Sequence, residues 1–278
     1  MRPSGGSSVS VSNDASPIID GMADLRPVHA RIERAHHHVA DLERLLSNYS
    51  GRSFQRSMRA GSVPDRIVER AELVEDPPIE AAMVVSDAVH QARAALDNLV
   101  NALRPDGAAS GVFFPIRATP ESYAEAVSAG ALRGVPEWAR ETIVALQPFS
   151  IDVRRWAGRE LPNLHELARL DRHRLPPIHA ALLAPDYASG DTQARIEARL
   201  DPARRWAEWE YDAGRGPVTV AFRVEVQFGP DSRQPDGVEV AGWTAYLIRG
   251  AAAAVDMVCE SRPLRLEAVR RLAGDPPP

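Results

Sequence analysis

The sequence predicts an α+β fold: a helical N-terminal half, made of an antiparallel helix pair and short helices, then a C-terminal antiparallel sheet and a C-terminal helix. Two observations predict it. Apolar residues recur at helical steps of three and four in the first half, whereas β-branched and aromatic residues between Gly, Pro and Asp turns dominate beyond residue 178. With 278 residues, 44% hydrophobic and 26% charged, the chain is long enough to bury a core and is neither wholly disordered nor membrane-embedded.

The composition divides the chain into four regions. Residues 1–22 are polar and Ser-rich and residues 272–278 end in GDPPP, so both are expected to be disordered tails. Residues 23–177 form the mainly helical region. Residues 178–271 form the antiparallel β region with its C-terminal helix.

The first half is expected to contain, in chain order, helix 25–47, a hairpin of strands 54–59 and 66–74, helix 79–104, a buried extended connector 111–116, short helices 120–128 and 136–146, and helix 161–174. The first helix has a clear amphipathic period, and the second long helix should pack antiparallel on it. Proline opens each short helix, where its missing N–H costs nothing. The last helix ends before Pro176, because proline disfavours helical geometry in the preceding residue.

The second half is expected to contain strands 178–183, 194–200, 206–211, 218–228 and 238–240 and then a helix over 243–261. Strand 218–228 has the clearest pattern, because apolar residues from Val218 to Phe228 occupy every second position. Helical spacing returns through Leu247, Val255 and Val258.

Residue usage excludes several classes of function. All 33 basic residues are arginine, so Schiff-base and Walker-type phosphate lysines are excluded, and the net charge of −5 argues against a general nucleic-acid binder. The single cysteine, Cys259, excludes an intrachain disulfide and fits a cytoplasmic location. The apolar stretch 241–259 is interrupted by Arg249 and Asp256, so no membrane span is expected. No nucleotide-binding or hydrolase motif occurs, and we expect no cofactor.

Helix 79–104 carries a polar stripe that is a candidate site. At 100° per residue its polar members fall within about 60° of one another; they are Ser86, His90, Arg93, Asp97 and Asn101. We take His90, Arg93 and Asp97 as catalytic candidates, because an imidazole, a guanidinium and a carboxylate on successive turns suit phosphate binding or acid–base chemistry. The alternative is a solvated helix face with an i,i+4 ion pair between Arg93 and Asp97.

A second dense cluster lies on helix 161–174, where His173 is a further catalytic candidate. Four polar residues there are candidate binding groups: Asn163, Glu166, Asp171 and Arg174. The alternative is a helix C-terminus whose basic residues stabilise the negative end of the helix dipole. Because buried charges persist only when partnered, we expect the two stripes to face each other. Arg93 would meet Asp171 or Glu166, and Asp97 would meet Arg174 or His173.

The consecutive histidines His36, His37 and His38 are not expected to form a metal site. Adjacent helix residues point 100° apart and do not converge on one ion. Glu33, His37 and Asp41 share a face and would offer two or three ligands. The sequence gives no stronger metal pattern, and we expect none.

Several segments resemble a family of uncharacterised bacterial proteins common in actinobacteria. The resemblance covers roughly residues 25–179 and is carried by SDAVHQARAALDNLV (86–100), FPI (114–116), LQPF (146–149) and residues 163–174 with their DRHR ending. It implies a shared fold and no reaction. The long helix of that family reads Arg, Ser, Ala, Leu, Asp, His, whereas Asn98 stands here at the last position.

An Arg followed four to six residues later by His on a helix is also the signature of HEPN domains, which are all-helical and often cleave RNA as dimers. Arg93 matches the first position, but Asn98 replaces the acid–base histidine, leaving His173 as a fallback base. Two function classes therefore stay open. One is a cytoplasmic binding or assembly module without catalysis, with a protein partner or a second copy. The other is a HEPN-like ribonuclease or phosphate-ligand enzyme that uses Arg93, His173 and Arg174.

Overall fold

A computed structural model describes residues 24–104, 112–150, 160–171, 173–183, 186–188, 197–201, 203–212, 219–221, 223–235 and 237–261. The predicted tails 1–22 and 272–278 lie outside these residues. The helices are α1 (Arg26–Ser50), α2 (Ile79–Ala102), α3 (Pro120–Ser128), α4 (Glu137–Ala145), α5 (Glu160–Asp171), the 3-10 turn η3 (Pro230–Ser232) and α6 (Val240–Glu260). The strands are β1 (Phe54–Ala60), β2 (Arg66–Leu73), β3 (Ile178–Leu182), β4 (Asp186–Ala188), β5 (Glu197–Leu200), β6 (Trp206–Asp212), β7 (Thr219–Ala221) and β8 (Val224–Phe228). The α+β class is confirmed.

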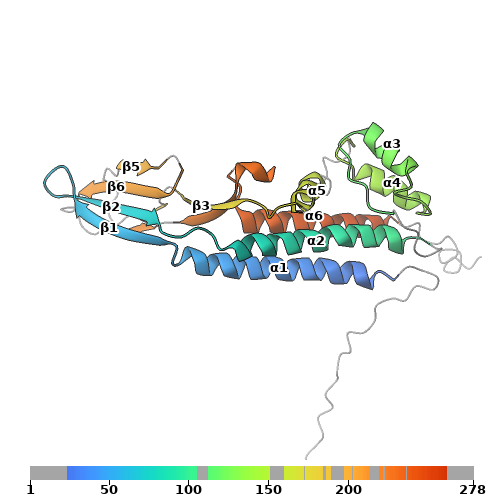
Figure 1. Cartoon of the computed structure of the whole chain (residues 1–278), viewed down its shortest axis with the longest axis horizontal. Helices are drawn as coiled ribbons and strands as arrows, with labels where there is room; N and C mark the ends of the chain where they lie inside the picture. Colours follow the sequence, from blue (N-terminus) through green and yellow to red (C-terminus); the bar gives the residue numbers. More distant parts are fainter. Residues whose placement is uncertain are drawn as a thin grey trace, which may run out of the picture.

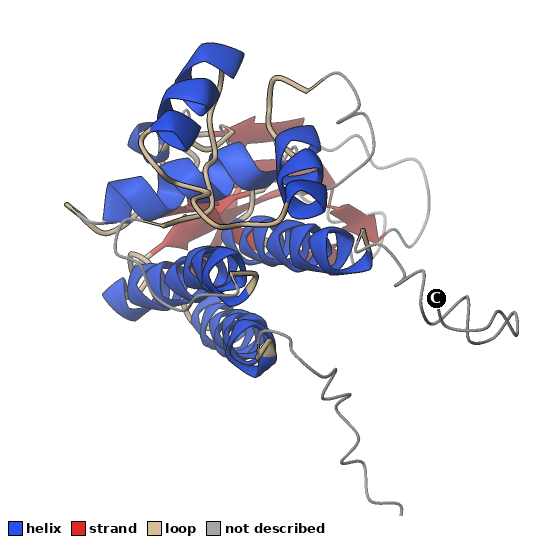
Figure 2. Cartoon of the chain, turned by 90° about the vertical axis from the view of Figure 1, so that its right-hand side faces the viewer, coloured by secondary structure: helices blue, strands red, loops and turns tan. Residues whose placement is uncertain are grey.

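The long helices form an elongated body. α1 runs toward the sheet and α2 runs back from it, which is the predicted antiparallel pair, and α6 packs on both (Figure 1). With the helical end turned to the viewer, the helices lie in front and the strands recede behind them (Figure 2). The apolar stripe of α1 is buried as its period predicts, through Val28, Ala35, Val39, Leu42 and Leu46.

A four-stranded antiparallel sheet projects from one end of this body (Figure 1). Its strand order is β1-β2-β6-β5, so the predicted N-terminal hairpin pairs with strands from beyond residue 178. In the middle of the sheet Met58 lies opposite Glu69, which lies opposite Trp209. Trp209 is buried at 1% exposure and anchors the sheet to its core.

Two predicted strands are corrected. In place of the single strand predicted over 218–228 there are two strands: β7 pairs with β4 and β8 with β3, and the register shifts by one residue between the pairings, from Leu182 opposite Val224 to Asp186 opposite Ala221. Residues 238–240 do not form a strand either. Glu239 makes one isolated bridge to Gln227, and its carboxylate accepts bonds from the Ala241 and Gly242 N–H groups, so this segment caps α6.

Within the described ranges, no helix has the length and apolar character needed to cross a membrane.

Candidate functional site at the seam of α2 and α5

Asp171 joins α5 to α2. Its Oδ1 accepts a hydrogen bond from the Ser86 hydroxyl, and its Oδ2 pairs with Nε2 of His90. Ser86 and His90 are four residues apart on α2, so one carboxylate spans one helical turn. The Asp171 side chain is 10% exposed and that of His90 is 46% exposed. The polar stripe of α2 therefore faces α5 at this point, as expected.

Arg93 and Asp97 together hold the backbone of Phe114. Nη2 of Arg93 donates to the Phe114 carbonyl at 2.7 Å, and Oδ1 of Asp97 accepts from the Phe114 N–H at 2.9 Å. The two side chains are also paired, 3.1 Å apart. Phe114 itself is fully buried, so the extended connector enters the core with both of its polar backbone groups satisfied by α2.

The i,i+4 pair between Arg93 and Asp97 is confirmed, but the side chain of Arg93 is only 11% exposed. The stripe is therefore buried at Arg93 and half-buried at Asp97, so the interpretation as a fully solvated face does not hold here. The ring of Phe113, next in the connector, lies 5.8 Å from the Arg117 guanidinium.

The outer face of α5 binds the loop that leads into α6. Glu166 accepts from both Arg169 and Arg233 at 2.9 Å, and the Asn163 carbonyl accepts from Gln234 at 3.4 Å. Arg174 donates to the Asp231 carbonyl at 3.0 Å. Three of the four candidate binding residues thus fix a neighbouring loop.

The predicted partners across the seam are corrected. Asp171 is bonded to Ser86 and His90 instead of Arg93, and Glu166 faces Arg169 and Arg233. The reason is that the connector at Phe114 lies against α2 at the level of Arg93 and Asp97. The N–H and C=O groups of Phe114 are therefore the partners of these two side chains, where side chains of α5 were expected. His173 is exposed just beyond the end of α5.

Ser86, His90 and Asp171 are the residue types of a hydrolase triad in the wrong order. In a triad the imidazole stands between the carboxylate and the hydroxyl, so that it removes the hydroxyl proton. Here the carboxylate stands between the other two groups, and the Ser86 oxygen also lies 3.0 Å from the Ala82 carbonyl. The arrangement ties two helices together and does not activate a nucleophile.

The described residues contain no group of three or more His, Cys, Asp or Glu placed to hold a metal ion. His36 and His37 are exposed on α1 and His38 is half-buried.

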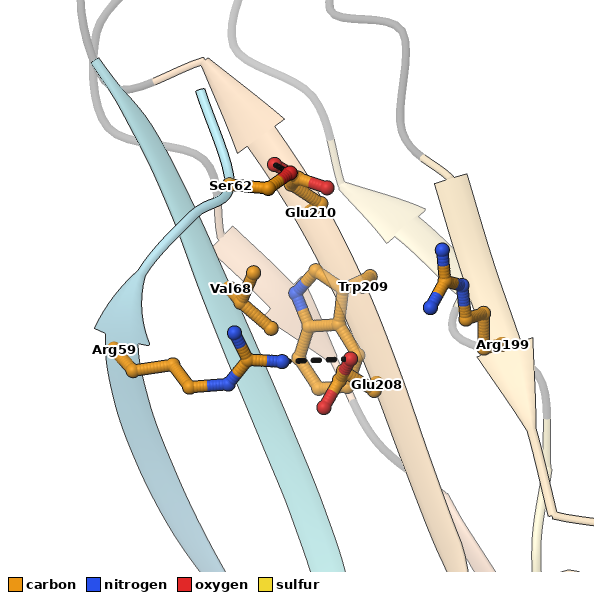
Figure 3. A pocket seen from close by; sticks show the side chains of 7 residues that line it. All are labelled: Arg59, Ser62, Val68, Arg199, Glu208, Trp209 and Glu210. Atoms are coloured by element: carbon orange, nitrogen blue, oxygen red, sulfur yellow. Dashed lines mark hydrogen bonds and ion pairs between the residues drawn. The ribbon is translucent and has the colours of Figure 1, made fainter. Parts of the chain in front are cut away.

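The sheet carries a polar hollow that sequence reasoning missed. It has a volume of about 200 Å³ (Figure 3) and is lined by Arg59, Ser62, Val68, Arg199, Glu208, Trp209 and Glu210. Arg59 pairs with Glu208 across 3.1 Å. The lining residues come from the N-terminal hairpin and from β5 and β6, which lie about 140 positions later in the chain. The only sequence pattern that points to the hollow is the alternation of acidic and aromatic residues along 206–212.

Comparisons of the chain with protein-family models, with curated proteins and with solved structures found no match.

Proposed function

We propose that the chain is a binding module without catalysis, whose projecting sheet contacts a protein partner. The observation that carries the proposal is the exposure of β1: from Gln55 to Ala60 every residue of this edge strand is exposed, and the strand runs from the end of α1 to the tip of the projecting sheet (Figure 1). Exposed edge strands are sites at which another chain is added. The single cysteine also leads us to propose a cytoplasmic location.

The contacts of the catalytic candidates support the same proposal. Ser86 and His90 are bonded to Asp171, and Arg93 and Asp97 are bonded to Phe114, so these groups have structural partners inside the molecule. A residue that acts on a substrate needs its reactive atom within reach of that substrate. The exposed side chains of β1, by contrast, are within reach of a macromolecular partner.

The test is affinity capture from the native host with two charge-matched variants. Arg59→Glu changes β1, whereas Arg34→Glu changes the exposed face of α1 and serves as the control. We expect a partner retained by the wild type and by Arg34→Glu and lost by Arg59→Glu. Turnover of RNA, nucleotides or esters that disappears in His90, Arg93 or His173 variants would overturn the proposal.

The second candidate is a HEPN-like ribonuclease or phosphate-ligand enzyme. One observation favours it: α1, α2, α5 and α6 pack together as a helical bundle that contains Arg93. Asn98 counts against it, because an amide does not supply the proton transfer of an imidazole. Incubation of the purified protein with labelled RNA, with and without EDTA and alongside Arg93→Ala, tests it. Cleavage by the wild type alone would favour the ribonuclease.

A further inference from the structure

We propose that the outer edge of β1 accepts an extended acidic segment of a partner protein as a fifth strand of the sheet. This inference rests on the proposed function and names its binding surface and the chemistry of the partner. Three observations carry it: the direction of the backbone groups of β1, the exposure of the strand, and the sign of its charges.

Two backbone hydrogen bonds fix which groups of β1 point outward. The Gly61 N–H donates to the Arg66 carbonyl at 2.7 Å, and the Ser53 carbonyl accepts from the Val74 N–H at 2.8 Å. In an antiparallel ladder every second residue bonds to the same neighbour. Odd-numbered residues from 53 to 61 therefore bond to β2, and the N–H and C=O groups of Met58 and Ala60 point toward the open edge.

This edge is accessible along its length. Among the described strands β1 has a neighbour on one side only, and Met58 is 67% exposed. Figure 1 shows the hairpin at the tip of the molecule, away from α3 and α4.

The charges of β1 select the partner. Its charged residues are Arg56 and Arg59, which project to opposite faces because they are three positions apart. Their carboxylate partners, Glu69 on β2 and Glu208 on β6, lie on the inner side of β1 at 3.6 and 3.1 Å. Both guanidinium groups are thus turned toward the inside of the sheet. Their side chains nevertheless stay 44% and 62% exposed, and ion pairs this exposed are weak enough for a carboxylate of an incoming strand to compete for the arginines.

A second copy of this chain fits the edge less well. Pairing β1 with itself would bring Arg56 and Arg59 of both copies to one seam, and β1 itself contains no carboxylate to offset the added arginines. Like charges that face each other in a sheet are destabilising. The same arginines thus discourage basic strands and favour an acidic one.

The test is amide hydrogen exchange on the full chain with two synthetic peptides. One alternates valine or threonine with glutamate over about eight residues, the usual upper length of a strand, and the other has lysine at each glutamate. In the free protein Met58 and Ala60 should exchange rapidly and Ser57 and Arg59 slowly. With the acidic peptide about tenfold above its dissociation constant, exchange at Met58 and Ala60 should slow about tenfold. The lysine peptide should leave it unchanged.

Two variants make the result specific. Met58→Pro removes an N–H group that points outward, and an edge strand tolerates proline at such a position. This variant should no longer bind the acidic peptide. Unchanged hydrogen exchange of the α2 amides would show that its fold is intact. Arg56→Glu with Arg59→Glu should reverse the preference toward the lysine peptide. Unchanged exchange at Met58 and Ala60 with millimolar acidic peptide would overturn strand addition. The proposed function would survive that result if Arg59→Glu abolished capture of the host partner, because the sheet would then bind the partner in a way other than strand addition.

Discussion

Arg93 and Asp97 are the residues whose role differs most from their sequence interpretation. Both were candidates for chemistry, and both instead satisfy the main chain of Phe114. Their types and spacing are visible in the sequence, and so is their ion pair. Their backbone partner is not visible, because it comes from a connector without regular secondary structure.

Arg93→Ala should lower the free energy of unfolding by about 2–3 kcal/mol, because it leaves the buried Phe114 carbonyl without its donor. Arg169→Ala is the control. It removes an exposed i,i+3 pair with Glu166, and the change should stay within about 0.5 kcal/mol. Urea denaturation measures both. Equal effects of the two substitutions would contradict the structural role of Arg93.

Tyr123 gives a pH-dependent prediction. Burial raises the pKa of its phenol to about 12, against a smaller lowering by Arg140. The unfolded chain releases this proton near pH 10, before the folded chain does. The contribution to stability is therefore complete below pH 10 and is lost as the pH rises toward 12. Wild type should lose more stability than Tyr123→Phe between pH 10 and 12 in urea denaturation, and parallel curves would refute this assignment.

Among the elements, α5 packs tightly against α6 at Gly250. A Cβ added there would lie 2.4 Å from the Cβ of Glu160, which is buried in the first turn of α5. Gly250→Ala should therefore destabilise the protein by about 1–3 kcal/mol despite the better helix propensity of alanine. Gly51→Ala is the control, since its Cβ would meet only atoms at 3.8 Å. Thermal unfolding measures both variants. If both unfolded at the same temperature as wild type, the prediction would be wrong and α5 would be free to shift away from the added methyl group.

Glu160 also has one buried carboxylate oxygen, Oε2, that finds no hydrogen-bond partner among the described residues. Glu160→Gln removes the charge and keeps the shape, so it should leave the protein as stable or raise its unfolding free energy by about 1 kcal/mol. Chemical denaturation at neutral pH measures this. A marked loss of stability would mean that the charge itself is needed.

Helices were predicted more accurately than strands, for a physical reason. A helix is made by neighbours in the sequence, so the apolar period of α1 and the proline at the start of α3 determine them locally. A strand is completed by a partner elsewhere in the chain. The period of 218–228 is correct as a pattern, but a one-residue shift of register between the pairings with β3 and β4 divides it.

At the scale of the whole molecule, local patterns predicted the helical body and the facing of α2 toward α5. They did not predict that the hairpin β1–β2 would join β6 and β5, because nothing in residues 54–73 specifies a partner beyond residue 200. The hollow on the sheet arises from this long-range pairing, because its lining comes from the hairpin and from β5 and β6. The hollow was therefore outside the reach of sequence reasoning.

We propose that this protein binds a partner through its projecting sheet and uses the α2–α5 seam for its own stability. Hydrogen exchange of the complex with the partner captured from the native host tests both parts of this proposal. We predict that amides of β1 gain protection on binding, Met58 and Ala60 foremost, while those of α2 from 85 to 97 do not change. Protection gained along α2 and α5 with β1 unchanged would contradict the account.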